Sequence, residues 1–72
     1  MNKYEIGVNA GKIWHLLKDN VRWSYQELKE ASGLSDRDLN AAIGWLARED
    51  KIDFQTNSGD DHLFLSVNVY IG

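Results

Sequence analysis

Cysteine and proline are both missing from this 72-residue chain, and it contains no long hydrophobic run. Without cysteine there is neither a disulfide framework nor a thiolate metal site, which fits a reducing compartment. Without proline, no helix is broken from within. Residues Met1 to Gly11 mix charged and polar side chains with isolated apolar ones, so they do not form a secretory signal. No span approaches membrane length, and we therefore expect a cytoplasmic protein.

Basic side chains are also few. Eight lysines and arginines stand against eleven aspartates and glutamates, which gives a net charge of -3 and a pI of about 5.1. Because sequence-independent binding to nucleic acid depends on basic side chains that displace counterions, this composition works against it. A chain this short holds one hydrophobic core, so residues 1–72 are predicted to form a single domain. Its narrow stability margin favours a homodimer.

The first third of the chain has the spacing of a helix. From about Glu5 to Asn20, apolar residues recur on one helical face, namely Ile6, Ala10, Ile13 and Leu17. Trp14 lies at the edge of this face, and we expect both Trp14 and Trp23 in the core. Gly7 and Gly11, four residues apart, are expected to allow close packing beside this helix.

Two capping signals then predict two short helices. Ser24 and Glu27 form a capping box, and Gly33 is placed to end the helix that follows. Ser35 and Asp38 repeat the capping arrangement at the start of a third helix, which ends near Asp50 and Lys51. Two short helices joined by a glycine-containing turn make a helix-turn-helix. The apolar residues expected to face the core are Leu28 and Ala31, followed by Leu39, Ile43 and Leu46.

The end of the chain alternates between apolar and polar residues, as strands do. Ile52 to Thr56 and His62 to Ile71 are predicted to form a β-hairpin around the turn-forming residues Asn57 to Asp61. Val21 to Trp23 predicts a short strand between the first two helices. The fold class is therefore α+β, a winged helix-turn-helix of three helices and a C-terminal β-hairpin wing.

A resemblance to known proteins strengthens this prediction. The apolar positions from Leu34-Ser35 through Leu39, Ile43 and Leu46 to Lys51-Ile52 are similar to those of winged-helix regulators. More narrowly, three segments resemble a family of small, stand-alone bacterial winged helix-turn-helix proteins of unknown function: Ile6-Gly7, Ala10-Gly11-Lys12 with Trp14, and Gly44 to Ile52. The resemblance implies the fold over nearly the whole chain and assigns no activity.

The third helix carries candidate DNA contacts. With its apolar residues toward the core, Arg37, Asn40 and Arg48 are free to meet a phosphate or guanine, an adenine, and the DNA backbone respectively. Acidic residues work against this reading, because Asp36, Asp38, Glu49 and Asp50 repel phosphate unless they are paired. The expected wing is acidic at Asp60-Asp61, whereas the wing of DNA-binding relatives typically brings a basic side chain to the duplex.

The alternative is a protein interface. Trp45 is either a core residue under the wing or an exposed aromatic between the small residues Ala41 and Gly44, and a large aromatic in the exposed setting is typical of an interface anchor. The last strand is about twice as long as its partner, so its end has an apolar edge that favours pairing with a second copy across a two-fold axis unless Lys3 to Glu5 cover it. Our leading hypothesis is a homodimeric module that acts through protein contacts, with DNA-binding transcriptional regulation as the alternative. The candidate interface residues are Ala41, Trp45, Arg48, Val67, Val69 and Ile71.

No catalytic, metal or cofactor site is predicted. The segment from Gly7 to Lys12 superficially suggests a phosphate-binding loop, but it is one residue too short between its glycines and lacks the Ser or Thr that holds magnesium. His15 and His62 have no partner at metal-ligand spacing. A domain of this size also offers little concavity for a convergent nucleophile, base and acid, so we do not expect an enzyme.

Overall fold

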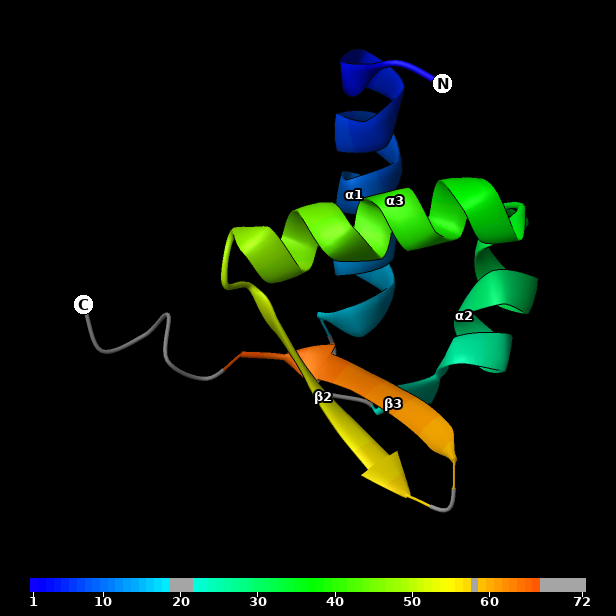
Figure 1. The fold of residues 1–72 in the computed structure, drawn as a ribbon, viewed down its shortest axis with the longest axis vertical. Coiled ribbons are helices and arrows are strands. Elements are labelled where there is room, and N and C mark those ends of the chain that lie inside the picture. Colours follow the sequence, from blue (N-terminus) through cyan, green and yellow to red (C-terminus); the bar gives the residue numbers. More distant parts are fainter. Residues whose placement is uncertain (19–21, 58, 67–72) are drawn as a thin grey trace.

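The computed structural model describes residues 1–18, 22–57 and 59–66, and three helices and three strands lie within them (Figure 1). The strands form one antiparallel sheet in the order β1-β3-β2. This confirms the α+β winged-helix architecture. The elements are α1 (Lys3–Leu17), β1 (Trp23–Ser24), α2 (Tyr25–Ser32), α3 (Asp36–Arg48), β2 (Ile52–Asn57) and β3 (Asp60–Leu65).

Helix α1 begins two residues earlier than predicted because Asn2 caps it. The Asn2 side chain accepts a hydrogen bond of 2.8 Å from the backbone N–H of Glu5, which satisfies one of the free donors at the helix start. The predicted apolar face is confirmed for Ala10, Ile13 and Leu17, which are buried, whereas Ile6 is half-buried. The described helix ends at Leu17, and the predicted end at Asn20 lies outside the described residues.

Two expectations about α1 are wrong. Trp14 is 37% exposed rather than part of the core, because it lies at the rim of the buried face and turns outward. Gly7 and Gly11 do not serve close packing, since a Cβ atom added at either would meet nothing within 4 Å. Both glycines therefore border open space and not a neighbouring element.

Capping residues fix both ends of the second helix. Ser24 ends β1 and also caps α2, where both halves of the predicted capping box with Glu27 are present. Gly33 has φ 72°, a left-handed conformation that glycine adopts without a steric penalty, and it ends α2 as predicted. Leu28 is fully buried, but Ala31 is exposed, so the expected two-residue apolar face is wrong. Helix α2 thus has one fully buried residue.

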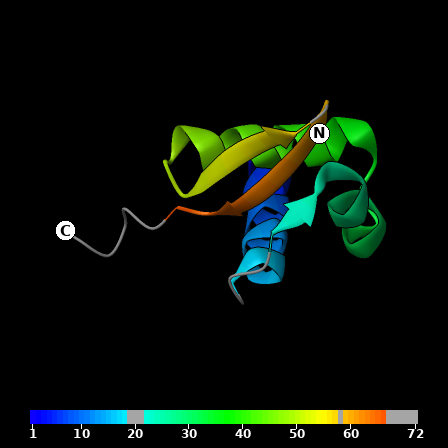
Figure 2. The same ribbon diagram turned by 90° about the horizontal axis from the view of Figure 1, so that it is seen from below.

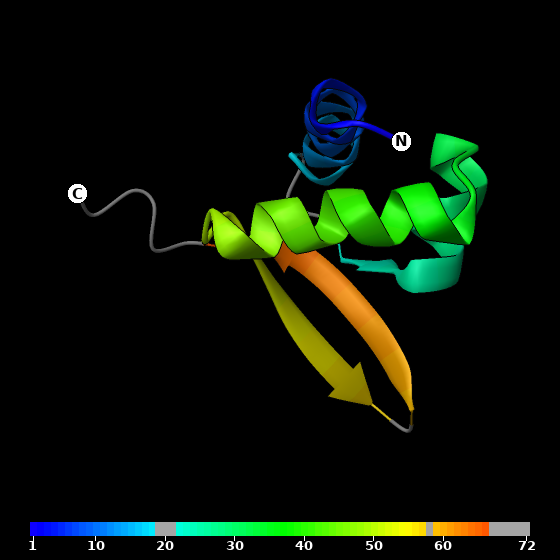
Figure 3. The same ribbon diagram turned by 45° about the horizontal axis from the view of Figure 1, so that its top comes forward.

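Helix α3 crosses α1 and supplies the other large part of the core (Figures 1 and 3). The Ser35 side chain caps it by accepting from the backbone N–H of Asp38 at 3.2 Å. Ala42 is fully buried whereas Ile43 is half-buried, so the buried face is turned slightly from the predicted one. The buried hydrophobic residues of the described chain are Ala10, Ile13, Leu17, Leu28, Leu39, Ala42, Leu46, Ile52 and Leu63.

The hairpin is tighter at its tip than predicted. Strands β2 and β3 pair from Ile52 with Leu65 to Asn57 with Asp60, so only two residues remain between them instead of the expected five-residue turn. At its base, the backbone N–H of Ser66 donates to the carbonyl of Lys51 at 2.9 Å. β3 begins at Asp60 and ends at Leu65, so the predicted strand is wrong at Ser66, and its remainder, from Val67 to Ile71, lies outside the described residues.

The short strand before α2 is confirmed, but it ends at Ser24, one residue later than predicted, and does not include Arg22. Trp23 and Ser24 pair with β3, opposite Leu63 and His62 (Figure 2), while Val21 lies outside the described residues. The indole of Trp23 is half-buried and packs against the core, as expected. The guanidinium of Arg22 lies 4.8 Å from the centre of the Phe64 ring, a cation–π contact that ties β1 to β3.

A polar cluster joins α2 to the start of α3. The Tyr25 hydroxyl donates to Oδ1 of Asp36 at 2.8 Å, and the Lys29 ammonium donates to Oδ2 at 3.2 Å. These bonds lower the pKa of Asp36, the tyrosine bond most and the lysine bond next. Partial burial, followed by the bond to Asp36, raises the pKa of the Tyr25 hydroxyl.

A matched pair of glycine substitutions tests this account of the backbone. Gly44 lies in the middle of α3 with open space beside it, so Gly44→Ala should stabilise the protein by about 0.5–1 kcal/mol. Gly33→Ala should destabilise it by about 1 kcal/mol, because alanine at positive φ is strained. Urea denaturation of both variants measures the two free energies of unfolding. Shifts of the same sign would contradict the argument.

The Asp36 cluster predicts a dependence on acid. Because its pKa is lowered from 3.8 in the folded protein, the charged form stabilises the fold above that pH, and the stabilisation is lost as the pH falls through the folded pKa. The difference in free energy of unfolding between wild type and Asp36→Asn should therefore be constant above pH 3.8 and shrink below it.

The matched variant is Tyr25→Phe, which removes the strongest hydrogen bond to Asp36. In the Tyr25→Phe background, the difference in free energy of unfolding caused by Asp36→Asn should be smaller at every pH. Thermal unfolding from neutral to strongly acidic pH measures all of these values. A difference that does not change with pH would contradict the assignment.

Candidate functional site

The outward face of α3 is a stripe without acidic residues. Arg37, Asn40, Gly44 and Arg48 are exposed and spaced by three or four residues, so they follow one another along the helix on the side opposite Leu39 and Leu46. Ala41, one of the candidate interface residues, is half-buried. The structure thus brings together the three predicted DNA-contact residues.

The acidic residues of α3 lie beside this stripe or beyond its ends. Asp36 is paired with Lys29 and Tyr25, so the repulsion of phosphate expected from this residue is offset by a neighbouring cation. Asp38 is half-buried beside the N-terminal cap, and Glu49 and Asp50 follow the last turn. None of these last three side chains has an ion pair among the described residues.

The described part of the wing is acidic and has no lysine or arginine. Asp60 and Asp61 are exposed at the start of β3, and the Thr56 hydroxyl donates to Oδ1 of Asp61 at 2.7 Å. The nearest lysine or arginine along the chain is Lys51, which precedes β2. The tip that approaches DNA in DNA-binding winged helices is therefore negatively charged here.

Trp45 lies at the flank of the stripe and is 45% exposed, as the interface interpretation expected. Its neighbours Gly44 and Arg48 are exposed as well. An indole with this much free surface, beside a residue without a side chain, can be covered closely by another molecule. Of the candidate interface residues, Ala41, Trp45 and Arg48 share this part of α3, whereas Val67, Val69 and Ile71 lie outside the described residues.

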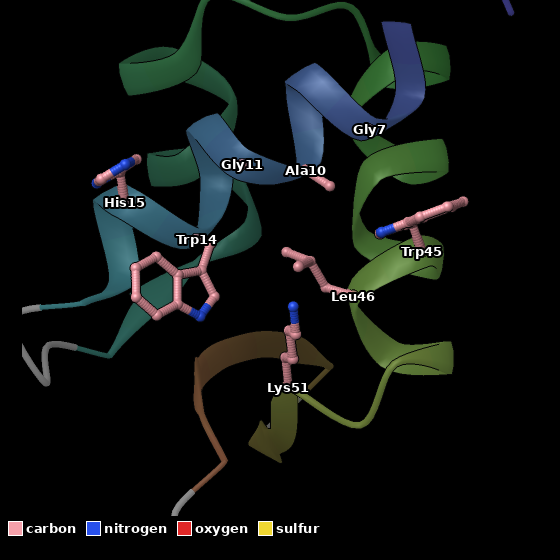
Figure 4. Close-up of a pocket in the computed structure, with 8 residues that line it drawn as sticks. All are labelled: Gly7, Ala10, Gly11, Trp14, His15, Trp45, Leu46 and Lys51. Carbon is pink, nitrogen blue, oxygen red and sulfur yellow. The ribbon is translucent and has the colours of Figure 1, made fainter. Parts of the chain in front are cut away.

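Sequence reasoning did not foresee a pocket of about 340 Å³ between α1 and α3 (Figure 4). Trp14 and Trp45 lie on either side of it, and Lys51 lies at its lower edge. The signal in the sequence was the pair of helical glycines on the Trp14 side of α1. On the sequence alone, these glycines are attributed to close helix packing and not to a pocket. The lining residues are Gly7, Ala10, Gly11, Trp14 and His15 from α1, Trp45 and Leu46 from α3, and Lys51.

The turn after α3 places Lys51 at this pocket. Asp50 has φ 60°, a left-handed conformation that aspartate tolerates better than most residues, and it reverses the chain after α3. The backbone N–H of Lys51 then donates to the carbonyl of Leu46 at 3.0 Å. Together with the bond from Ser66, this holds the Lys51 backbone at both its N–H and its carbonyl group.

Other signals for chemistry are weak in the described residues. No group of three or more His, Cys, Asp or Glu side chains there could hold a metal ion. His15 is exposed on α1 and His62 is half-buried on β3, so the two imidazoles come from different elements. Nδ1 of His62 and Nε1 of Trp23 are buried without a hydrogen-bond partner in this part of the chain. None of the described helices is long and apolar enough to span a membrane.

Comparisons with known proteins agree with this architecture. An uncharacterized protein from Methanocaldococcus jannaschii is 44% identical over 50 residues, which are 67% of this chain and 71% of that protein. A protein from Bacteroides thetaiotaomicron solved by solution NMR has a TM-score of 0.85 and 33% identity, over 100% of this chain and 88% of the other.

A more distant neighbour has a stated activity. A structure of HOP2, concerned with its DNA recognition and protein interaction domains and with homologous DNA pairing, has a TM-score of 0.68 and 25% identity. The match covers 81% of this chain and 98% of that one. The model of the family described as winged helix-turn-helix domain (DUF2582) matches residues 1–65. The chain therefore belongs to this winged helix-turn-helix family.

Proposed function

We propose that this protein is a non-enzymatic, cytoplasmic recognition module, a single domain that acts mainly through protein contacts and forms a homodimer. The observation that carries the proposal is the exposure of Trp45 on α3, the helix that winged-helix proteins present to their targets. Tryptophan and arginine are enriched among the residues that dominate binding energy at interfaces. Trp45 and Arg48 supply these side chains, and Ala41 supplies a small neighbour.

The charge of the wing supports protein over DNA as the main partner. Asp60 and Asp61 would meet the phosphates that a wing approaches, and no lysine or arginine follows Lys51 to offset them. A protein partner carries no comparable density of negative charge. The wing therefore costs a DNA complex more than it costs a protein complex.

The homodimer rests on two arguments from the chain. A domain of this size buries a small share of its surface, and a second copy adds to that burial. The sequence from Val67 to Ile71 alternates as an edge strand would, and pairing across a two-fold axis satisfies such an edge. We propose two interfaces. One consists of Trp45 with Ala41 and Arg48, and the other of Val67 with Val69 and Ile71.

DNA binding is the second candidate, and a specific observation favours it. The stripe of Arg37, Asn40 and Arg48 is free of acidic residues, and Asp36 beside it is already paired. The HOP2 neighbour has DNA recognition as well as protein interaction domains, and homologous DNA pairing properties. In this alternative, a transcriptional regulator, the three side chains contact the major groove.

Sedimentation equilibrium tests the homodimer. The wild type should sediment as a dimer, and Trp45→Ala should raise the dimer dissociation constant about 30-fold, as the loss of an interface anchor does. A charged residue in place of Val69 should give a monomer if the last strand pairs.

The control for this measurement is Phe54→Ala, which removes an aromatic side chain that is 48% exposed on β2. This variant should remain dimeric. A wild type that is monomeric at all concentrations tested would exclude the homodimer, and equal weakening by Phe54→Ala and Trp45→Ala would exclude a specific role for Trp45.

An amide chemical-shift titration with generic duplex DNA at low salt separates the two candidates. A protein-contact module should show no shifts clustered on residues 35–48. Clustered shifts that weaken steeply with added salt, and that Arg37→Ala and Arg48→Ala reduce, would instead support the DNA-binding candidate. Lys12→Ala, on the exposed side of α1, is the matched control and should change neither result.

A further inference from the structure

We propose that the pocket between α1 and α3 is a binding site for a small aromatic carboxylate. The site shares Trp45 with the proposed protein interface, but Trp14 and Lys51, on which the pocket also depends, take no part in that interface. Its volume of about 340 Å³ is at the lower end for small-molecule sites. It is larger than a second pocket, of about 270 Å³, that Tyr4 and Asp38 help to line.

The two tryptophans offer hydrogen-bond donors to the pocket. Trp14 and Trp45 come from different helices, and in Figure 4 the indole nitrogen of each turns toward the space between them. Neither indole N–H has a hydrogen-bond partner among the described residues. The edge of an indole ring carries partial positive charge, so it attracts both an anion and the face of another aromatic ring.

The charge of the lining favours an anion. Among the eight lining residues there is no aspartate or glutamate, although the whole chain is acidic. Lys51 has no ion pair within the described residues, and Figure 4 shows its ammonium rising toward the same space as the indole nitrogens. One ammonium and two indole N–H groups match the two oxygens of a single carboxylate.

The inner wall of the pocket suits the apolar part of such a ligand. Ala10 and Leu46 are buried beneath it, and the missing side chains of Gly7 and Gly11 leave the helix surface open. A planar ring can therefore lie against α1 with its carboxylate toward Lys51. The edge-to-face contact of His15 with Trp14, with ring centres 5.7 Å apart, supports the Trp14 ring from outside.

A phosphate or nucleotide fits these residues less well. The backbone N–H groups of Gly7 and Gly11 lie inside α1 and are used by the helix, so no set of free backbone donors faces the pocket. Lys51 alone cannot match the charge of a di- or triphosphate. The second pocket, of about 270 Å³, includes Glu5 and Asp38 in its lining and disfavours any anion.

Titration of the ¹⁵N-labelled protein with indole-3-acetate tests the proposal. The indole N–H signals of Trp14 and Trp45 should shift with a single dissociation constant on the order of one millimolar, as expected for a ligand of this size. The signal of Trp23, on β1 and away from the pocket, is the internal control and should stay in place. Tryptamine, which carries a cation in place of the carboxylate, should bind at least about tenfold more weakly.

Two pairs of variants locate the site. Lys51→Gln should weaken indole-3-acetate about tenfold and remove its preference over tryptamine, whereas Lys12→Gln should leave both unchanged. Gly11→Leu should block the pocket and abolish binding, whereas Gly44→Leu, at an equally open helical position on α3, should not. Retained chemical-shift dispersion shows that each variant is folded.

Three outcomes would overturn the proposal: no saturable shift of Trp14 and Trp45, equal affinity for tryptamine, or binding that Lys51→Gln does not change. None of them bears on dimerisation or DNA binding, which are measured without ligand. Failure of this proposal is thus distinguishable from failure of the proposed function.

Discussion

The packing of α1 across α3 is the contact on which the rest of the structure depends. Ala10 and Ile13 from α1 and Ala42 and Leu46 from α3 are all buried in the same core. Small side chains on both helices allow a close crossing, and the larger ones fill the space around it. This crossing decides which side of α3 is exposed and therefore which residues a partner can reach.

The same crossing creates the pocket. Next to the buried face of α1 lie Gly7 and Gly11, which have no side chains. The space between α1 and α3 is therefore not filled by residues of α1. On α3 the chain continues through Trp45 and Leu46 to a left-handed turn at Asp50, which brings Lys51 back beneath the opening. Helix α3, the pocket and the wing thus meet at the turn that precedes β2.

Local signals in the sequence were enough for the fold. The capping residues Ser24 and Ser35, the left-handed Gly33 and the apolar face of α1 act over a few positions, and each was predicted correctly. The errors concern features that depend on distant residues. The rotation of α3 that buries Ala42 rather than Ile43 is set by α1, and the extension of the hairpin to Asn57 and Asp60 is set by pairing between strands.

In the candidate site, too, the features set by local sequence could be predicted and those set by distant residues could not. Arg37, Asn40 and Arg48 share a helix, so their common face could be derived from spacing alone. The pocket could not be derived in this way, because Trp14 and Trp45 belong to different helices and approach one another only in the folded chain. Trp14 was assigned to the core because an aromatic beside an apolar face is usually buried.

The exposed residues around the pocket also argue that the site is selected for binding. A glycine inside a helix costs about 0.5–1 kcal/mol relative to alanine, and the open space at Gly7 and Gly11 means that packing does not require either of them. Tryptophans that remain partly exposed likewise leave apolar surface in water. When several local rules are broken at one place in a small domain that is otherwise consistent, function is the better explanation than stability. Since these departures surround the same space as the unpaired Lys51, that space is where we place the ligand.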